Sequence, residues 1–427
     1  MEHQQQVQVI GGGFAGVEAA WQLARAGIAA TIWEMKPNRK SPAHTLDTLA
    51  EPVCSNSFKA LRVESAAGLL KEEMGRLGSL CLSCAYECAV PAGGALAVDR
   101  EKFSQLVTDK IAAEPLVTLR REEVTKIPAT GTVIVAAGPL CSDALADDIQ
   151  RLCGDGLRFY DAAAPIVTAE SLDPAHCFTA SRYDRGGADD YINCPLTRDE
   201  YEQFHAALRT AERAHTHDFD VYEGCMPIEV LAGRGADAIR YGPMKPVGLR
   251  DPATGKRPWA VLQLRRENAE GTMLNLVGFQ TNLKFGEQKR VFGLMPALAH
   301  AEFVRYGVMH RNSYIDSPRL LGADYAFRTR EGLYFAGQIT GVEGYMESAG
   351  SGLLAGLNAA RRLLGQPPFI PPRTTMLGAL AHYISDPNVQ DFQPMGANFG
   401  LLPPLDTVIK GKRDRYAALA ERSLRNL

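Results

Sequence analysis

Two of the nine cysteines stand in polar surroundings where a thiol could react. Cys54 lies in the segment Pro52-Val53-Cys54-Ser55-Asn56, and Cys225 lies in Glu223-Gly224-Cys225-Met226. A thiolate is a strong nucleophile that can form a covalent intermediate with a substrate. A single cysteine is more often a small buried apolar residue, so these surroundings by themselves assign no role to either thiol.

Three further cysteines invite a test for a metal site. Cys81, Cys84 and Cys88 have the spacing C-x2-C-x3-C, but no nearby Cys or His completes a ligand set of familiar spacing. Positions i, i+3 and i+7 share one stripe of a helix, which is typical of core or surface cysteines. We therefore predict no metal site. No redox C-x-x-C follows the first expected helix either, which argues against a thiol oxidoreductase.

A glycine-rich motif stands between an apolar strand at residues 7–10 and a helix. Gly11 permits a tight turn, Gly13 lets the backbone approach a pyrophosphate, and Gly16 lets the helix pack closely on the strand. The unpaired N–H groups at the start of the helix attract phosphate. The motif predicts a dinucleotide-binding fold. It fits G-x-G-x-x-G and consists of Gly11, Gly12, Gly13, Phe14, Ala15 and Gly16.

A second strand and an acidic residue extend this motif. Residues 30–33 form the strand and run into Glu34, which stands 23 residues after Gly11. A carboxylate at this distance can accept hydrogen bonds from the adenosine ribose. Strand, glycines, helix, strand and acid in one register are far more specific than G-x-G-x-x-G alone, but they do not separate FAD from NAD.

Two later segments favour FAD. Residues 132–138 and 332–338 each form an apolar strand that ends at a glycine. They resemble the returning strand and the second FAD motif of the glutathione-reductase superfamily, in which an acid usually stands at the place of Gln338. A small-residue helix follows near residue 348, and its N-terminus could face the flavin. The predicted contacts from these segments are Gly138, Gly337, Gln338, Ser348 and Gly350.

The texture of the sequence changes in the middle of the chain. From Cys194 to about Pro296, a polar helix and short strands broken by Gly and Pro replace the earlier alternation. We predict an α/β protein with a Rossmann-like FAD-binding domain in two parts, residues 1–193 and 297–427. An inserted smaller α/β domain is expected at residues 194–296.

Composition excludes several classes of protein. The 427 residues are 46% hydrophobic and 22% charged, which is ordinary for globular chains. No apolar run reaches the ~18 residues that cross a bilayer, and the polar N-terminus shows no signal-peptide pattern. Nine cysteines, an odd number, indicate free thiols in a reducing compartment. We expect a cytoplasmic protein with no membrane contact.

The charge of the chain is unevenly distributed. The net charge of −3 offers no overall attraction to nucleic acid. Residues 240–330, however, contain 15 Lys and Arg against 7 Asp and Glu. Such a segment is typical of a solvated surface or of a basic face for phosphate.

Motifs spread nearly from end to end match those of one family. They lie at residues 11–21, 53–57, 68–74, 90–100, 224–229, 241–249, 302–312 and 333–358. Taken together, they resemble the bacterial folate- and FAD-dependent tRNA (uracil-5-)-methyltransferases called TrmFO. The departures are small: Val17 replaces a small polar residue, and Phe285 stands where some members have tryptophan.

The resemblance implies a reaction for the two cysteines. Cys225 is the expected nucleophile and Cys54 its partner near the flavin, for example as a base; the reverse assignment stays open. A thiolate that adds to uracil C6 lets C5 attack the one-carbon unit of methylenetetrahydrofolate. That carbon needs two electrons, which reduced FAD supplies and NADH or NADPH restores. Whether the methylene passes directly to uracil or through the flavin stays open.

The resemblance also implies a folate site and an RNA partner. His310 corresponds to the family's folate-stacking residue, and Phe285 belongs to the same pocket; the residue pattern alone favours a core histidine at 310. The basic segment 240–330 would bind RNA phosphates, and the target uracil would turn out of its stack. The implied substrate is the T-loop uridine 54 of tRNA, and no stable protein partner is inferred.

Three alternatives stay open at this point. Ribosomal RNA could be the target of an enzyme that carries the same motifs. A longer related family modifies the wobble uridine, and the end of the chain at Leu427 argues against it. The third alternative is a non-catalytic RNA-binding flavoprotein, against which the intact Cys54 and Cys225 motifs argue.

Overall fold

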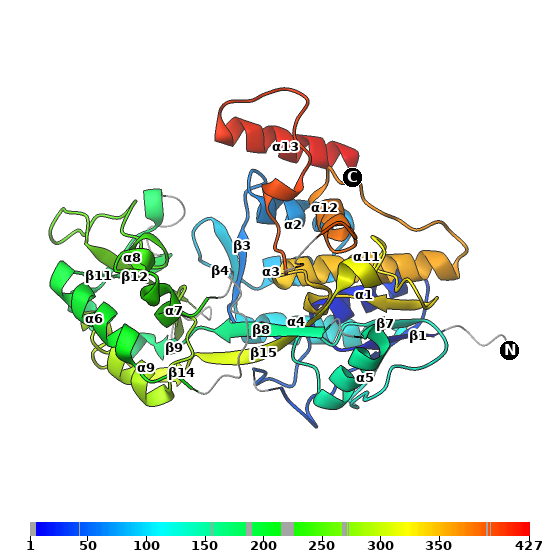
Figure 1. The fold of residues 1–427 in the computed structure, drawn as a ribbon, viewed down its shortest axis with the longest axis horizontal. Helices are drawn as coiled ribbons and strands as arrows, with labels where there is room; N and C mark the ends of the chain where they lie inside the picture. The colour runs from blue at the N-terminus through cyan, green and yellow to red at the C-terminus, as the bar shows by residue number, and fades with distance from the viewer. Residues whose placement is uncertain are drawn as a thin grey trace.

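Two separate hydrophobic cores organise the chain. The structure, a computed structural model, describes residues 6–41, 43–154, 157–184, 190–214, 226–266, 271, 273–389, 392 and 394–427. The first core joins residues from 7–153 with residues from 315–420, and the second joins residues from 167–303. We call the two parts the first lobe and the second lobe; Figure 1 shows the second lobe, mostly in green, on the left.

A parallel sheet forms the centre of the first lobe. Its strand order is β16-β7-β1-β2-β6, and all pairings between neighbours are parallel. The strands are β1 (Val7–Ile10), β2 (Ala30–Trp33), β6 (Val117–Arg120), β7 (Val133–Val135) and β16 (Leu333–Phe335). Strand β16 joins the sheet by pairing with β7, 200 residues earlier in the chain, and the expected α/β fold class is confirmed.

Two helices, α1 (Phe14–Arg25) and α11 (Tyr345–Leu363), pack on each other over this sheet. A Cβ added to Gly352 would lie 2.1 Å from the carbonyl oxygen of Ala15, so only glycine permits this approach. The rings of Phe14 and Tyr345, the first residues of the two helices, stack with centroids 4.8 Å apart. The close packing thus places both helix N-termini side by side.

Several of the remaining helices of the first lobe begin at side-chain caps. Ser65, Ser79 and Asp99 each accept a backbone N–H at the start of the helix that follows, which satisfies a donor that has no partner inside the helix. These helices are α2 (Ala66–Arg76), α3 (Leu80–Glu87), α4 (Arg100–Ala112), α5 (Asp143–Cys153), α10 (Ser317–Leu320), α12 (Met376–Tyr383) and α13 (Lys412–Asn426).

One buried acid joins three of these helices. Glu73 of α2 accepts the backbone N–H groups of Met376 and Leu377 at 2.7 and 2.8 Å, and the Ser423 hydroxyl of α13 donates to it. The partial positive charge at the start of α12 favours a carboxylate at this place.

Next to α2, a small antiparallel sheet comprises β3 (Ser57–Ala60), β4 (Ala89–Val90) and β5 (Ala95–Val98).

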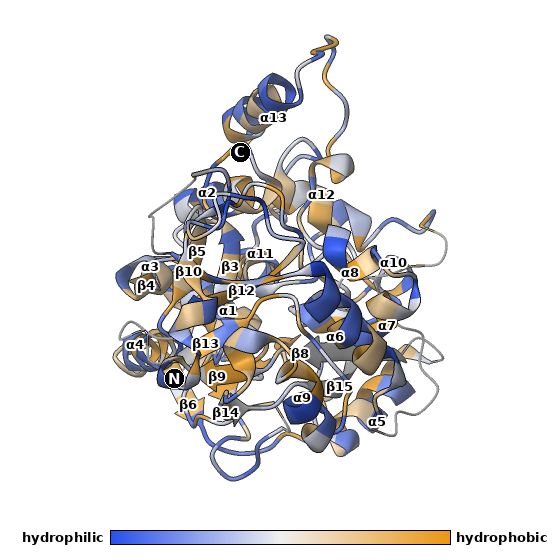
Figure 2. Cartoon of the chain, turned by 90° about the vertical axis from the view of Figure 1, so that its left-hand side faces the viewer, coloured by the Kyte–Doolittle hydropathy of each residue, from blue (hydrophilic) through white to orange (hydrophobic). Residues whose placement is uncertain are grey.

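The second lobe is an antiparallel sheet covered by helices. The sheet order is β10-β11-β12-β13-β9-β14. Figure 2 shows hydrophilic outer helices, α6 and α9, beside the hydrophobic strand β9. The strands are β9 (Ile166–Thr168), β10 (Phe178–Thr179), β11 (Tyr191–Leu196), β12 (Ala260–Arg266), β13 (Met273–Leu276) and β14 (Phe303–Arg305). The helices are α6 (Arg198–Thr210), α7 (Ile228–Gly233), α8 (Ala238–Tyr241) and α9 (Phe285–Phe292).

The second lobe takes in more of the chain than the segment 194–296 expected from composition. Strands β9 and β14 pair with each other and belong to its sheet. Two long antiparallel strands, β8 (Leu157–Ala163) and β15 (Val308–Ile315), run between the lobes (Figure 1). The polar helix and the short strands broken by Gly and Pro indicated the helical part of the lobe. The first and last strands of the lobe, β9 and β14, lie outside that segment, and the sequence did not distinguish them from strands of the neighbouring domain.

Candidate active site

A cleft of ≈ 1050 Å³, open to solvent, lies at the carboxyl ends of β1, β2 and β7. Parallel α/β sheets bind their ligands at this edge, where the connections diverge. The lining residues that the sequence predicted as cofactor contacts are Gly11, Gly12, Gly13, Phe14, Ala15, Glu34, Gly138, Gly337, Gln338 and Ser348.

The glycines of the motif differ in what surrounds them. Gly11 has φ +107°, and a Cβ there would lie 2.4 Å from the carbonyl oxygen of Ala136. A Cβ on Gly13 or Gly138 would meet no protein atom within 4 Å. Because both residues line the cleft, a side chain at either place would project into the space for a ligand. At these glycines the backbone itself borders the cleft, which fits the close approach of a dinucleotide.

Two predicted contacts do not line the cleft. A Cβ on Gly16 would lie 1.8 Å from the carbonyl oxygen of Gly11, so this glycine serves the packing of α1 on β1. Gly350 faces α12 instead, and its Cβ would lie 2.9 Å from Leu377. Both glycines therefore serve packing within the first lobe.

Glu34 is held at the end of β2 by backbone groups. Its carboxylate accepts the N–H of Gly12 at 2.9 Å and the N–H of Lys36 at 3.0 Å, and the residue is buried. The carboxylate therefore bridges the glycine motif and the end of the second strand. This is the place at which a ribose hydroxyl would meet an acceptor.

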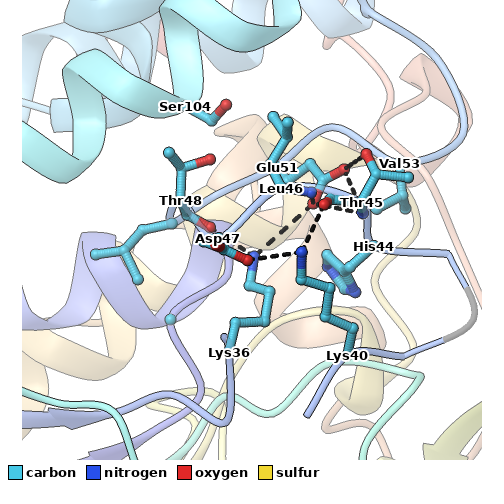
Figure 3. Close-up of polar contacts among 12 residues, drawn as sticks. Lys36, Lys40, His44, Thr45, Leu46, Asp47, Thr48, Glu51, Val53 and Ser104 are labelled. Atoms are coloured by element: carbon cyan, nitrogen blue, oxygen red, sulfur yellow. Dashed lines mark hydrogen bonds and ion pairs between the residues drawn. The ribbon is translucent and has the colours of Figure 1, made fainter. Parts of the chain in front are cut away.

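A loop from residue 43 to 51 forms one wall of the cleft and is organised by a buried charge pair. Glu51 accepts the Thr45 N–H at 3.0 Å and lies 3.9 Å from Lys36 Nζ, which also donates to the Thr48 carbonyl (Figure 3). Burial lowers the pKa of Lys36 below its usual range. His44 and Glu51 both line the cleft, so this pair shapes the ligand space.

Cys54 lies beside this cleft and contacts a residue that the sequence did not single out. Its Sγ is 2.9 Å from the hydroxyl oxygen of Tyr345, which lines the cleft. The same oxygen accepts the backbone N–H of Cys54 at 2.7 Å and that of Ser55 at 3.2 Å. The available signal was the position of Tyr345 at the start of the helix expected to face the flavin.

The Cys54 segment is also fixed by two arginines. Arg100 of α4 donates to the carbonyl of Val53 at 3.2 Å. Arg265, a buried residue of β12 in the second lobe, donates to Ser55 Oγ at 2.7 Å and to Asn56 Oδ1 at 3.1 Å. Hydrogen bonds from the second lobe therefore reach the first lobe at segment 53–56, next to the cleft.

The structure describes the other predicted site residues only in part. Cys225 lies outside the described residues. The backbone of His310 pairs with Asp161 in β15 and β8; its side chain is outside the described parts. Phe285 is 56% exposed and stacks on Tyr306 with centroids 4.8 Å apart. The structure thus brings Cys54 to the cleft, and it places Phe285 on the surface of the second lobe.

The cysteines of the C-x2-C-x3-C pattern are part of the core around α3. Cys81 and Cys84 are buried, and burial raises the pKa of the Cys84 thiol to about 12. Within the described residues, no group of three or more His, Cys, Asp and Glu could hold a metal ion. In the same residues, no helix is long and apolar enough to cross a membrane.

Comparisons with known proteins agree with this geometry. Residues 6–367 match the family model described as glucose inhibited division protein A, GIDA. The proteins named methylenetetrahydrofolate--tRNA-(uracil-5-)-methyltransferase TrmFO from Moorella thermoacetica and Geobacter sulfurreducens are 57% and 55% identical to this chain. The alignments cover 98% and 99% of this chain and 96% and 98% of those proteins.

A solved structure shares the fold. Aquifex aeolicus GidA in its form II crystal superposes with a TM-score of 0.70 at 18% identity. The match covers 89% of this chain and 67% of that one. At this identity, the likeness speaks for the fold alone.

Proposed function

Since the chain belongs to the GIDA family and to the TrmFO methylenetetrahydrofolate--tRNA-(uracil-5-)-methyltransferases, we propose that it methylates uracil C5 in tRNA. The carbon donor is methylenetetrahydrofolate, and FAD occupies the cleft. The observation that carries the proposal is the placement of Cys54 against Tyr345, at the wall of a dinucleotide cleft and within reach of the second lobe.

Different residues of the cleft would hold the different parts of FAD. The backbone N–H groups at the start of α1 would face the pyrophosphate, and Glu34 would accept from the adenosine ribose. Gly337, Gln338 and Ser348 lie at the start of η6 (Gln338–Thr340) and α11, where they would hold the flavin end. When bound, reduced FAD supplies the two electrons that turn a methylene into a methyl group, and NADH or NADPH restores them.

The two cysteines activate uracil and manage its proton. The Cys225 thiolate adds to C6, and the electron pair released to C5 attacks the methylene carbon of the folate. The C5 proton then passes to a base, for which Cys54 is the assigned residue, and the bond between the methylene carbon and the folate nitrogen breaks, so that the folate leaves. The two electrons that reduced FAD would supply then convert the exocyclic methylene into a methyl group, and the C6–S bond breaks to restore the double bond. The segment after Cys225 is well anchored, because Glu229 accepts the Thr281 hydroxyl and the Asn282 N–H, both at 2.8 Å.

The second lobe offers cations for RNA phosphates. Many basic residues of segment 240–330 have acidic partners, for example Lys284 with Glu212 and Arg290 with Glu287. Four exposed cations on one loop have no ion pair within the described residues, and they would contact the RNA backbone. They are Lys245, Arg250, Lys256 and Arg257.

The test uses holoprotein, unmodified tRNA transcript, NADPH and methylenetetrahydrofolate labelled in its one-carbon unit. Label should appear in 5-methyluridine, and mass spectrometry of nuclease fragments should place it in the T loop, at position 54. Labelled S-adenosylmethionine in a parallel reaction should transfer nothing. Transfer from S-adenosylmethionine, or label in ribosomal RNA with none in tRNA, would contradict the proposal.

A further inference from the structure

The hydroxyl of Tyr345 has a defined direction. Its oxygen accepts two backbone N–H groups, from Cys54 at 2.7 Å and from Ser55 at 3.2 Å. A phenol oxygen with both acceptor sites used still has one hydrogen to donate. The remaining partner within hydrogen-bond distance, among the described residues, is Cys54 Sγ at 2.9 Å. The geometry therefore directs the hydroxyl hydrogen at the sulfur.

We propose that Tyr345 is a positioning residue that holds Cys54 as a thiolate by donating its hydroxyl hydrogen to Sγ. The inference rests on the proposed function in that Cys54 takes part in the reaction. It assigns to Cys54 the stabilising partner that a reactive thiol needs. A hydrogen bond to the charged form of a group favours that form.

The proton stays on the tyrosine in this arrangement. Burial, followed by the negative charge of Cys54, raises the pKa of Tyr345 well above its ordinary value. An ordinary thiol has a pKa near 8.5, so the sulfur ionises before the phenol does. Arg100, whose charge acts on the same hydroxyl, adds a cation to the site. When the pair loses one proton, the neutral phenol and the thiolate are thus the stable form.

Packing fixes the phenol in place. The Tyr345 ring stacks on Phe14 at 4.8 Å and meets the edge of Phe58 at 5.6 Å. On the other side, Arg100 and Arg265 hold the residues that flank Cys54. These contacts fix the phenol and the backbone on both sides of Cys54, so the oxygen and the sulfur are held close together.

A thiolate held in this way can act as the base that removes the C5 proton of uracil. When the C5–H bond of uracil breaks, the proton goes to Cys54 Sγ and its electron pair stays with the ring. The sulfur, now a thiol, keeps the hydrogen bond from Tyr345, so the phenol is unchanged by the step. Tyr345 thereby keeps the sulfur ionised beforehand and oriented throughout.

The experiment measures the reactivity of Cys54 as a function of pH in FAD-loaded protein. Wild type, Tyr345→Phe and Tyr334→Phe are treated with iodoacetamide from pH 5 to 10, and the Cys54 peptide is quantified by mass spectrometry. Tyr334→Phe is the matched control, because it also removes a buried phenol hydroxyl from the same core. Flavin absorbance reports whether each variant keeps its cofactor.

The midpoint of Cys54 alkylation in wild type should lie below the ordinary ~8.5. Tyr345→Phe should raise it by about one pH unit, which slows alkylation about tenfold near neutral pH, and Tyr334→Phe should leave it unchanged. Equal midpoints in wild type and Tyr345→Phe, or a wild-type midpoint at or above ~8.5, would overturn the proposal.

A second measurement keeps the test possible if the Tyr345→Phe variant loses its cofactor. If Tyr345→Phe does not retain FAD, a fluorinated tyrosine at position 345 replaces it; the more acidic phenol should lower the midpoint, and an unchanged midpoint would refute the role. Neither assay contains RNA or folate. A protein that shows the shift but methylates nothing would disprove the function and not the contact, whereas methylation without any shift would disprove the role of Tyr345.

Discussion

The dinucleotide cleft and the Cys54 site lie side by side but are built in different ways. Part of the cleft is lined by the glycine motif, whose residues follow one another from Gly11 to Ala15. The Cys54 site joins side chains that are far apart in sequence: Tyr345 is 291 residues from Cys54, and Arg265 is 210 residues from Ser55. The first can be recognised from local spacing, whereas the second exists only once both lobes have folded and docked.

The largest expected effect is a loss of turnover that leaves FAD binding in the cleft intact. Cys225→Ala should lower turnover at least about a thousandfold, because a covalent nucleophile has no substitute. FAD should stay bound, since the cleft lies in the first lobe. With 5-fluorouracil at the target position, wild type should form a covalent protein–RNA adduct on denaturing gels, and Cys225→Ala should form none.

The matched variant tests the other thiol. Cys54→Ala should also impair turnover but still trap the fluorinated RNA, because its assigned role follows the addition to C6. If Cys225→Ala forms the adduct and Cys54→Ala does not, the two roles are reversed.

The next effect tests the hydrogen bonds by which Arg265 of the second lobe holds the Cys54 segment of the first lobe. Arg265→Ala removes the hydrogen bonds to Ser55 and Asn56 and should reduce kcat about a hundredfold, the cost of a small misplacement of reacting groups. Arg265→Lys keeps the charge but loses the planar fork, so its effect should be nearly as large. Arg209→Ala, an exposed change on α6, is the control; equal activity of all variants would show that the contact is dispensable.

Two glycine substitutions sharpen the comparison within the first lobe. Gly13→Val places atoms in the open cleft and should weaken FAD binding at least tenfold, with the unfolding free energy of the apoprotein changed by less than about 0.5 kcal/mol. Gly352→Ala puts a methyl group 2.1 Å from the Ala15 carbonyl and should cost about 1–3 kcal/mol of unfolding free energy. FAD titration and urea unfolding check both, and the reverse pattern would be inconsistent with the cleft as described.

The last effect concerns the pH dependence of stability and a buried acid of α1. Glu18 of α1 accepts the N–H groups of Leu80 and Cys81, and burial raises its pKa to about 7. A carboxyl with a raised folded pKa binds its proton more tightly in the folded state, so this stabilisation is present below the unfolded pKa of about 4.5 and is lost as the pH rises to about 7.

Glu18→Gln removes this titration. The stability of wild type relative to the variant should fall by up to about 3 kcal/mol between pH 4.5 and 7.5, as measured by urea unfolding. Parallel pH profiles for the two proteins would mean that Glu18 titrates normally.

Several features of this protein were determined by the sequence alone. The strand–glycine–helix motif, the acid at Glu34 and the two later glycine strands predicted the dinucleotide fold, because the turn, the helix start and the strand end each depend on a few adjacent residues. The motifs spread along the chain predicted its family, which the comparisons confirmed. Ten of the cofactor contacts predicted from these motifs line the cleft.

Only the tertiary structure decided how the remaining residues are used. Gly16 and Gly350 belong to the same local patterns as the cleft glycines, yet they serve helix packing. The first and last strands of the second lobe joined its sheet through pairing over more than a hundred residues. Tyr345 contacts Cys54 through the packing of α11, and Arg265 of β12 contacts the following residues, Ser55 and Asn56. Local spacing encodes a turn or a cap, but contacts between distant side chains depend on how whole elements pack, which no short motif records.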